Sequence, residues 1–98
     1  MTAPTRPTEG FKLDSGKPRY DLIPPVALAQ VVDVLTYGAK KYAPENWRRV
    51  LDADQRYFAA AQRHLWAHKR GELRDPETGL SHLAHATCCL MFMLESSK

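Results

Sequence analysis

The sequence has no long apolar run, almost no cysteine and little net charge, and each of these shortages excludes a class of protein. No stretch of the 98 residues is apolar over the length needed to cross a bilayer, and residues 1–10 lack the apolar segment of a secretory signal. The two cysteines, Cys88 and Cys89, are adjacent, where a mutual disulfide is geometrically poor, so we expect reduced core residues. We therefore predict a cytoplasmic protein with no membrane partner.

The small net charge also gives little support for a nucleic-acid binder. Fourteen Lys and Arg residues stand against eleven Asp and Glu, which leaves a formal charge of +3. This excess fits a protein that handles anions, but the signs are too mixed for the continuous basic surface that nucleic acids require. A chain of 98 residues forms one domain with a small core, and such a domain is a candidate for oligomerisation.

The first quarter of the chain has no helical periodicity. We expect residues 1–10 to be disordered and residues 11–98 to form a single domain. From Phe11 to Pro25, turn residues and prolines exclude a helix and predict an extended, ordered arm. The arm is either a surface wrap packed through its apolar residues or a phosphate clamp, and the sequence leaves both open. The clamp would use Lys17, Arg19 and Tyr20.

Apolar residues at helical spacing then predict three helices, so the fold class is all-α. Proline in the first turn starts the first helix, aspartate is able to cap the second, and Gly71 stops it. The first predicted helix begins at Pro24-Pro25 and ends at Ala43-Pro44, the second runs from Asp52 or Asp54 to Arg70, and the third from Gly79 or Leu80 to Glu95.

The third predicted helix is apolar on two sides. The first stripe consists of Leu80, Leu83, Ala84, Thr87, Leu90, Met91 and Leu94, and the second stripe of His82, His85, Ala86, Cys89 and Met93. Both sides need to be covered, and three helices of one chain cover only part of that surface. We therefore predict that the second stripe meets a partner subunit, and that a homodimer or homotetramer completes the bundle.

All four histidines lie at two helix ends joined by an acidic loop. His64 and His68 are on the second predicted helix, and His82 and His85 share one face at the start of the third. For His68 we prefer a hydrogen-bonded core residue over a ligand. Mixed imidazole and carboxylate sites accept manganese, iron, cobalt or zinc. The candidate metal ligands are His64, His82, His85, Glu72 and Asp75.

The turn after the first predicted helix gathers cationic and aromatic residues. Lysine and arginine suit phosphates, and a tryptophan is able to stack on a base. The alternative, which the sequence favours, is that Trp47 fills the edge of the core and the charges are solvated. The candidate substrate ligands in this region are Lys40, Lys41, Asn46 and Trp47.

Several of these motifs, in this order, resemble a phage-associated family. They are Lys17-Pro-Arg-Tyr-Asp-Leu-Ile-Pro-Pro25, Tyr37-Gly-Ala-Lys-Lys-Tyr42 with Asn46-Trp47, Arg63-His64, Arg70-Gly-Glu72 and Gly79-Leu-Ser-His-Leu-Ala-His85. The family is that of the small dATP/dGTP diphosphohydrolase-like proteins, also called MazZ-like, which are related to the MazG-type all-α nucleoside triphosphate pyrophosphohydrolases. The resemblance covers roughly Phe11 to Leu94.

This resemblance implies an oligomeric helical bundle that cleaves a purine deoxynucleoside triphosphate between the α and β phosphates, using a divalent metal. A phage-encoded enzyme would act in the host cytoplasm. MazG-type enzymes hold Mg²⁺ with two pairs of carboxylates, but here His82 and His85 align with the second pair and His64 stands at the first. Imidazoles disfavour magnesium, so we expect Mn²⁺ or Co²⁺ in preference, with Zn²⁺ or Fe also compatible.

Two functions follow from the sequence. The first is a metal-dependent nucleotide pyrophosphohydrolase in which the histidines hold the ion and the basic residues balance the triphosphate charge. The catalytic candidates are Glu72, Asp75 and, as general base, Glu77. The alternative is a non-catalytic helical module that binds a nucleotide or a protein, suggested by the missing carboxylate pairs.

Overall fold

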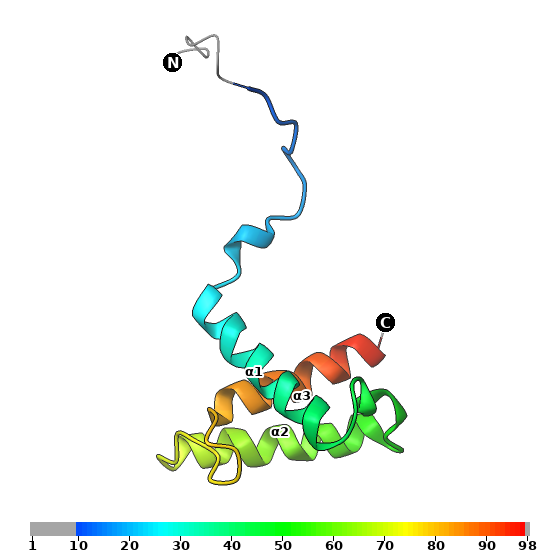
Figure 1. Cartoon of the computed structure of the whole chain (residues 1–98), viewed down its shortest axis with the longest axis vertical. Coiled ribbons are helices and arrows are strands. Elements are labelled where there is room, and N and C mark those ends of the chain that lie inside the picture. Colours follow the sequence, from blue (N-terminus) through cyan, green and yellow to red (C-terminus); the bar gives the residue numbers. More distant parts are fainter. Residues whose placement is uncertain (1–9, 98) are drawn as a thin grey trace.

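A computed structural model describes residues 10–97, and in this range the chain is helical with no strand. The elements are a 3-10 turn η1 (Tyr20–Leu22), helix α1 (Pro25–Lys41), a second 3-10 turn η2 (Asn46–Arg49), helix α2 (Ala53–Lys69) and helix α3 (His82–Ser96), as Figure 1 shows. The predicted all-α class, with three main helices after an N-terminal arm, is confirmed. The prediction of disorder concerns residues that, except for Gly10, lie outside the described part.

The helix ends follow local chemistry. Pro25 opens α1 at the position where a missing N–H costs nothing. Asp52 precedes α2 with a left-handed φ of 53°, but its side chain makes no capping hydrogen bond, so the predicted carboxylate cap is wrong. Ser81 caps α3, because its Oγ accepts hydrogen bonds from the N–H groups of Leu83 and Ala84 at 3.1 and 3.4 Å. The third helix therefore begins later than predicted.

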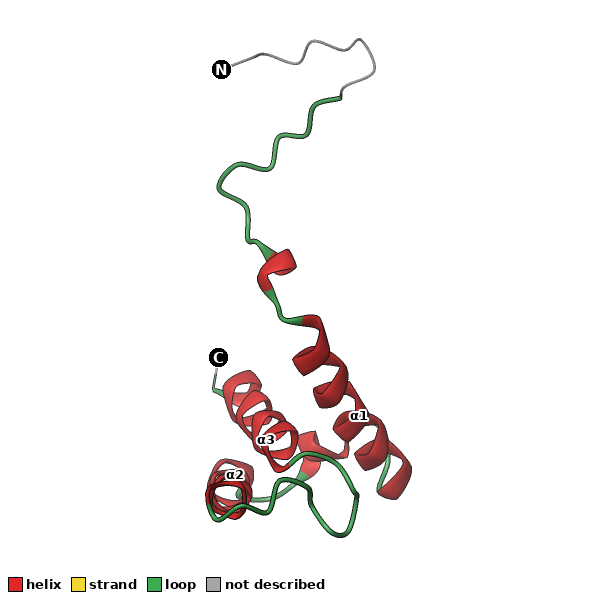
Figure 2. Ribbon diagram, turned by 90° about the vertical axis from the view of Figure 1, so that its left-hand side faces the viewer, coloured by secondary structure: helices red, strands yellow, loops and turns green. Residues whose placement is uncertain are grey.

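Helix α3 packs against both other helices, as Figure 2 shows. Small residues dominate the contact with α1, where Val31 and Val34 meet Ala84 and Cys88. Larger residues close the edges of this cluster: Leu35, Leu80 and Phe92. No helix in the described part has both the length and the hydropathy of a membrane span.

The two apolar stripes of α3 are not covered as predicted: the second stripe packs inside the chain, and the first is covered only where Leu80 and Ala84 pack near α1. Ala86 and Cys89 of the second stripe are 2% and 7% exposed because α2 of the same chain covers them. The prediction that the second stripe meets a partner is therefore wrong. The uncovered side belongs to the first stripe, and its exposed apolar residues are Leu83, Leu90, Met91 and Leu94.

The N-terminal arm, residues 10–24, extends away from the three helices in both views (Figures 1 and 2). Its apolar side chains are uncovered, with Phe11 86% and Leu13 85% exposed. Arg19 and Asp21 form a two-point ion pair at 2.8 and 2.7 Å, which gives η1 a local contact. The arm is extended as predicted, but it does not wrap the surface of its own chain.

Candidate metal centre

The loop between α2 and α3 turns sharply at Gly71. Gly71 has a φ of +99°, and its N–H donates to the carbonyl of His68 at 2.9 Å, while the N–H of Glu72 donates to the carbonyl of Ala67 at 3.0 Å. This pattern satisfies the last carbonyls of a helix with a glycine in the left-handed region. It reverses the chain and brings Glu72 toward the start of α3.

The rest of the loop closes as a short hairpin. The N–H of Asp75 donates to the carbonyl of Leu80 at 2.8 Å, and the N–H of His82 donates to the carbonyl of Leu73 at 3.0 Å. Arg74 and Ser81 form an isolated antiparallel bridge. Because backbone hydrogen bonds fix both sides of the loop, Asp75 has a defined position next to the two helix ends.

Three side chains from three segments converge at this point. His64 from α2 and His82 from α3 bring their Nδ1 atoms to 2.8 Å, and Oδ2 of Asp75 lies 3.9 Å from Nδ1 of His64. One ligand atom from each residue lies within 4.8 Å of the others, the single such grouping of potential ligands between residues 10 and 97. The distance of 3.9 Å is too long for a hydrogen bond, so the carboxylate faces the imidazole across a gap.

Glu72 fixes the proton on His82. Nε2 of His82 lies 2.7 Å from Oε1 of Glu72. An ionised carboxylate only accepts, so Nε2 carries the proton and donates it. In neutral His82 the Nδ1 atom then presents a lone pair toward His64. A carboxylate behind an imidazole is the usual way in which proteins orient a histidine ligand.

Asp75 is held by backbone donors that leave one oxygen available. Its Oδ1 accepts hydrogen bonds from the N–H groups of Glu77 at 2.7 Å and Thr78 at 3.2 Å. Burial alone would raise the pKa of Asp75, but these donors and the nearby imidazoles outweigh it, and the pKa is lowered. The residue is therefore a carboxylate at neutral pH, with Oδ2 directed at the histidine pair.

His64 is neutral at physiological pH. Burial, with smaller contributions from His85 and His82, lowers its pKa to about 4. Only one proton occupies the 2.8 Å contact between the two Nδ1 atoms, since two N–H groups would repel each other. A cation that displaces this proton would meet two ring nitrogens and one carboxylate oxygen. That donor set suits a first-row transition ion, so the residues fit the predicted metal.

His85 does not join this group. Its ring stacks on that of His64 with centroids 4.6 Å apart and planes 10° apart, and its Nε2 lies 2.8 Å from Oγ1 of Thr78. Burial lowers the pKa of His85. The shared helical face of His82 and His85 was predicted correctly, but the inference that both rings point at one ion does not match this geometry. His85 supports the His64 ring instead.

Glu77, the predicted general base, is engaged on the outside of the loop. Its Oε2 accepts hydrogen bonds from Nζ of Lys41 at 2.6 Å and from the hydroxyl of Tyr37 at 3.2 Å. The Lys41 hydrogen bond lowers the pKa of Glu77. The carboxylate thus ties the C-terminal end of α1 to the loop, and the side chain of Lys40, on the same helix, is exposed to solvent.

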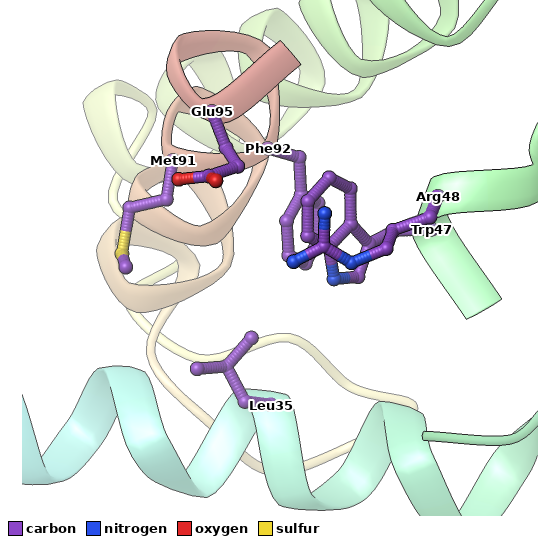
Figure 3. A pocket seen from close by; sticks show the side chains of 6 residues that line it. All are labelled: Leu35, Trp47, Arg48, Met91, Phe92 and Glu95. Atoms are coloured by element: carbon purple, nitrogen blue, oxygen red, sulfur yellow. The ribbon is translucent and has the colours of Figure 1, made fainter. Parts of the chain in front are cut away.

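The remaining substrate candidates lie apart from the histidines. Trp47 stacks on Phe92 with centroids 4.7 Å apart, and the guanidinium of Arg48 lies over the Trp47 ring (Figure 3). This supports the interpretation of Trp47 as a filler of the core edge. Asn46 opens η2 beside it. Lys17, Arg19 and Tyr20 are on the exposed arm, and the chain does not bring them to its own histidines.

Two contributors were not recognised in the sequence. Thr78 holds His85 and also accepts a hydrogen bond from the N–H of Leu80 at 3.1 Å. Tyr37 holds Glu77 from α1. Thr78 precedes Gly79 in a turn, where hydroxyl side chains commonly bond the backbone, so turn chemistry was the available signal. Nothing in the spacing pointed to Tyr37.

Comparison with known proteins gives one family. The family model described as "dATP/dGTP diphosphohydrolase, N-terminal" matches residues 7–98. A protein of Salmonella phage PMBT28 named dATP/dGTP diphosphohydrolase is 38% identical over 84 residues, which is 86% of this chain and 28% of that protein. The chain thus spans little more than a quarter of the length of this curated relative. No solved structure matches the chain.

Proposed function

The chain belongs to the dATP/dGTP diphosphohydrolase N-terminal family, and from this premise we propose that it hydrolyses a purine deoxynucleoside triphosphate with a divalent cation held by His64, Asp75 and His82. The substrate class comes from the name of the phage relative, dATP or dGTP. Water attacks the α-phosphorus and the bond to the bridging oxygen of the β-phosphate breaks. The products are the nucleoside monophosphate and pyrophosphate.

One observation supports this proposal more than any other. Donor atoms of three residues from α2, the loop and α3 lie within 4.8 Å of one another, two as ring nitrogens and one as a carboxylate oxygen. The turn hydrogen bonds of Asp75 occupy its Oδ1 and leave Oδ2 on the side of His64, 3.9 Å from its Nδ1. A bound divalent ion would supply positive charge for the phosphate oxygens and would acidify a water molecule.

The residues of the chain have distinct tasks in this proposal. His64, with a pKa of about 4, offers a neutral nitrogen at any pH near 7. Glu72 keeps the proton of His82 on Nε2 and thereby leaves Nδ1 free to bind. His85 and Thr78 hold the plane of the His64 ring. This nitrogen-rich donor set favours Mn²⁺ or Co²⁺ over Mg²⁺, which prefers an all-oxygen environment.

Incubation of the protein with each of the four dNTPs tests the proposal, with Mn²⁺, Co²⁺ or Mg²⁺ added to chelator-treated enzyme. We expect monophosphate and pyrophosphate from dATP or dGTP, with Mn²⁺ or Co²⁺ most effective, resolved by anion-exchange chromatography. The absence of monophosphate in every combination would reject the proposal. Nucleotide binding without turnover would favour the non-catalytic module instead.

A further inference from the structure

The buried core of the described chain consists of small side chains. The apolar residues with little exposure are valine, alanine and cysteine, and the most buried are Ala61 at 1%, Ala86 at 2% and Cys88 at 2%. Large apolar side chains are exposed instead, on the arm and on all three helices, among them Trp66 on α2 and Leu94 on α3. Since stability grows with the apolar area removed from water, these exposed side chains represent hydrophobic stabilisation that a single chain does not use.

The surface area gives the size of the missing contact. The chain exposes 8156 Å². A compact monomer of 11.1 kDa would expose about 5,700 Å². Ten residues lie outside the described range. Even if all ten are counted as fully exposed and left out, the accessible surface of the other residues exceeds that of a compact domain of their mass by about 1,300 Å². A specific protein interface buries about 800 Å² on each partner, so the excess is enough for one.

The arm cannot easily fold back to cover its own helices. It joins α1 through Pro24-Pro25, and both Ile23 and Pro24 have extended backbones, with ψ of 125° and 120°. Proline fixes its own φ and restricts the residue before it, so this junction is stiff and directs the arm away from the bundle. The 15 residues 10–24 would span at most about 50 Å if fully extended. The turn at residues 14–17 and η1 shorten this reach, but the arm still projects well beyond its own helices, far enough to contact a neighbouring copy.

The matching surface is the outer face of α3, formed by Leu83, Leu90, Met91 and Leu94. Met91 continues this face into a cavity of about 230 Å³ between α1, η2 and α3, shown in Figure 3. The cavity is smaller than the range of about 300 to 1,000 Å³ typical of small-molecule sites. It has room for a large apolar side chain. Its lining residues are Leu35, Trp47, Arg48, Met91, Phe92 and Glu95.

We propose that two copies of this chain exchange their arms, so that the arm of each packs on the outer face of α3 and the adjoining cavity of the other. The exchange is reciprocal, which is the arrangement that two-fold symmetry requires. The apolar residues that become covered are Phe11, Leu13, Tyr20, Leu22 and Ile23 of the arm. The proposal is independent of whether the protein hydrolyses nucleotides.

Sedimentation velocity of the full chain, across a range of concentrations, tests this exchange. We expect a dimer or a multiple of it, and we expect Leu22→Asp in the arm and Leu90→Asp on α3 each to weaken dimerisation by at least about tenfold. Both residues are exposed in a single chain, at 70% and 49%, so the monomer fold should survive, as circular dichroism will show. Leu51→Asp is the matched control, because Leu51 is 80% exposed outside both surfaces.

A mixing experiment identifies the partner surfaces directly. Chains with Leu22→Cys are mixed with chains carrying Leu94→Cys, and oxidation should give a mixed disulfide dimer, whereas Leu51→Cys with Leu94→Cys should not. Burial raises the pKa of the Cys88 thiol to about 12 and also raises that of Cys89, so the native cysteines compete little. A monomer at all concentrations, or a dimer unaffected by Leu22→Asp, would overturn the proposal.

Discussion

The two ends of the molecule differ in how many of their side chains find partners within the same chain. At the loop end, His82 is 4% exposed and both of its ring nitrogens have partners, His64 and Glu72. At the arm end, the side chains of Phe11 and Leu13 are more than four-fifths exposed to solvent. The comparison teaches that the histidine and carboxylate cluster is assembled within one chain, whereas a large part of the hydrophobic stabilisation is expected from association.

The largest expected effect is a loss of hydrolysis without a loss of folded structure. His82→Ala should lower dATP or dGTP hydrolysis by about 1,000-fold, because loss of a ligand removes several kcal/mol of charge stabilisation at the phosphate. Oligomeric state and helical signal should remain. His68→Ala is the control, since His68 is a half-buried histidine on α2 outside the cluster. Equal losses in both variants would mean that the loop end is not a distinct site.

The second effect is a pH dependence of stability in chelator-treated protein. The folded pKa of His64, about 4, lies below the unfolded value of about 6.5, so the folded state binds fewer protons in this range. The contribution of neutral His64 to the free energy of unfolding is therefore fully present above pH 6.5. It is lost as the pH falls toward 4, and the loss amounts to about 3 kcal/mol. Urea unfolding at fixed protein concentration measures this. In the His64→Gln variant, the free energy of unfolding should depend less on pH between 6.5 and 4. The same pH dependence in both proteins would contradict the lowered pKa of His64.

The third effect concerns the carboxylate behind His82. Glu72→Ala should weaken Mn²⁺ binding by about 10- to 100-fold, because Nε2 of His82 loses the acceptor that fixes its proton. Glu72→Gln keeps an acceptor without the charge and should recover part of the affinity. Titration calorimetry at neutral pH measures both. Glu45→Ala, which removes an exposed partner of Arg48, should leave the affinity unchanged.

The smallest effect is expected at Glu77. Its ion pair with Lys41 is solvent-exposed, and such pairs contribute little and are screened by salt. Glu77→Gln should slightly lower the urea midpoint at low ionic strength and not at high ionic strength. Hydrolysis should change by less than about threefold, whereas loss of a general base costs about 100-fold or more. A loss of that size would restore Glu77 as the base.

Much of the fold was accessible from the sequence because its signals are local. Pro25 at the start of α1 and Gly71 after α2 act within one turn of the chain, and both were predicted. The start of α3 was placed too early because Gly79 and Leu80 belong to the hairpin, where the carbonyl of Leu80 accepts from Asp75. The helical spacing of apolar residues also predicts the two stripes of α3, but it does not indicate which stripe packs against α2.

The site was predictable in composition but not in arrangement. Clustering of histidines and carboxylates pointed to five metal ligands, of which His64, Asp75 and His82 converge, while Glu72 instead accepts a hydrogen bond from His82. The exclusion of His85 depends on the hydroxyl of Thr78, and the engagement of Glu77 depends on Lys41, which is 36 residues away in the sequence. Contacts of this kind arise from the loop conformation and from helix packing, and neither is encoded by spacing along one helix.

Anomalous diffraction from crystals soaked with Mn²⁺ tests the central claim most directly. The account predicts one peak per chain within bonding distance of Nδ1 of His64, Oδ2 of Asp75 and Nδ1 of His82, absent in crystals of the His82→Ala variant. The account would be contradicted by crystals with no peak between these three atoms, or with manganese held only by other carboxylates such as Glu77.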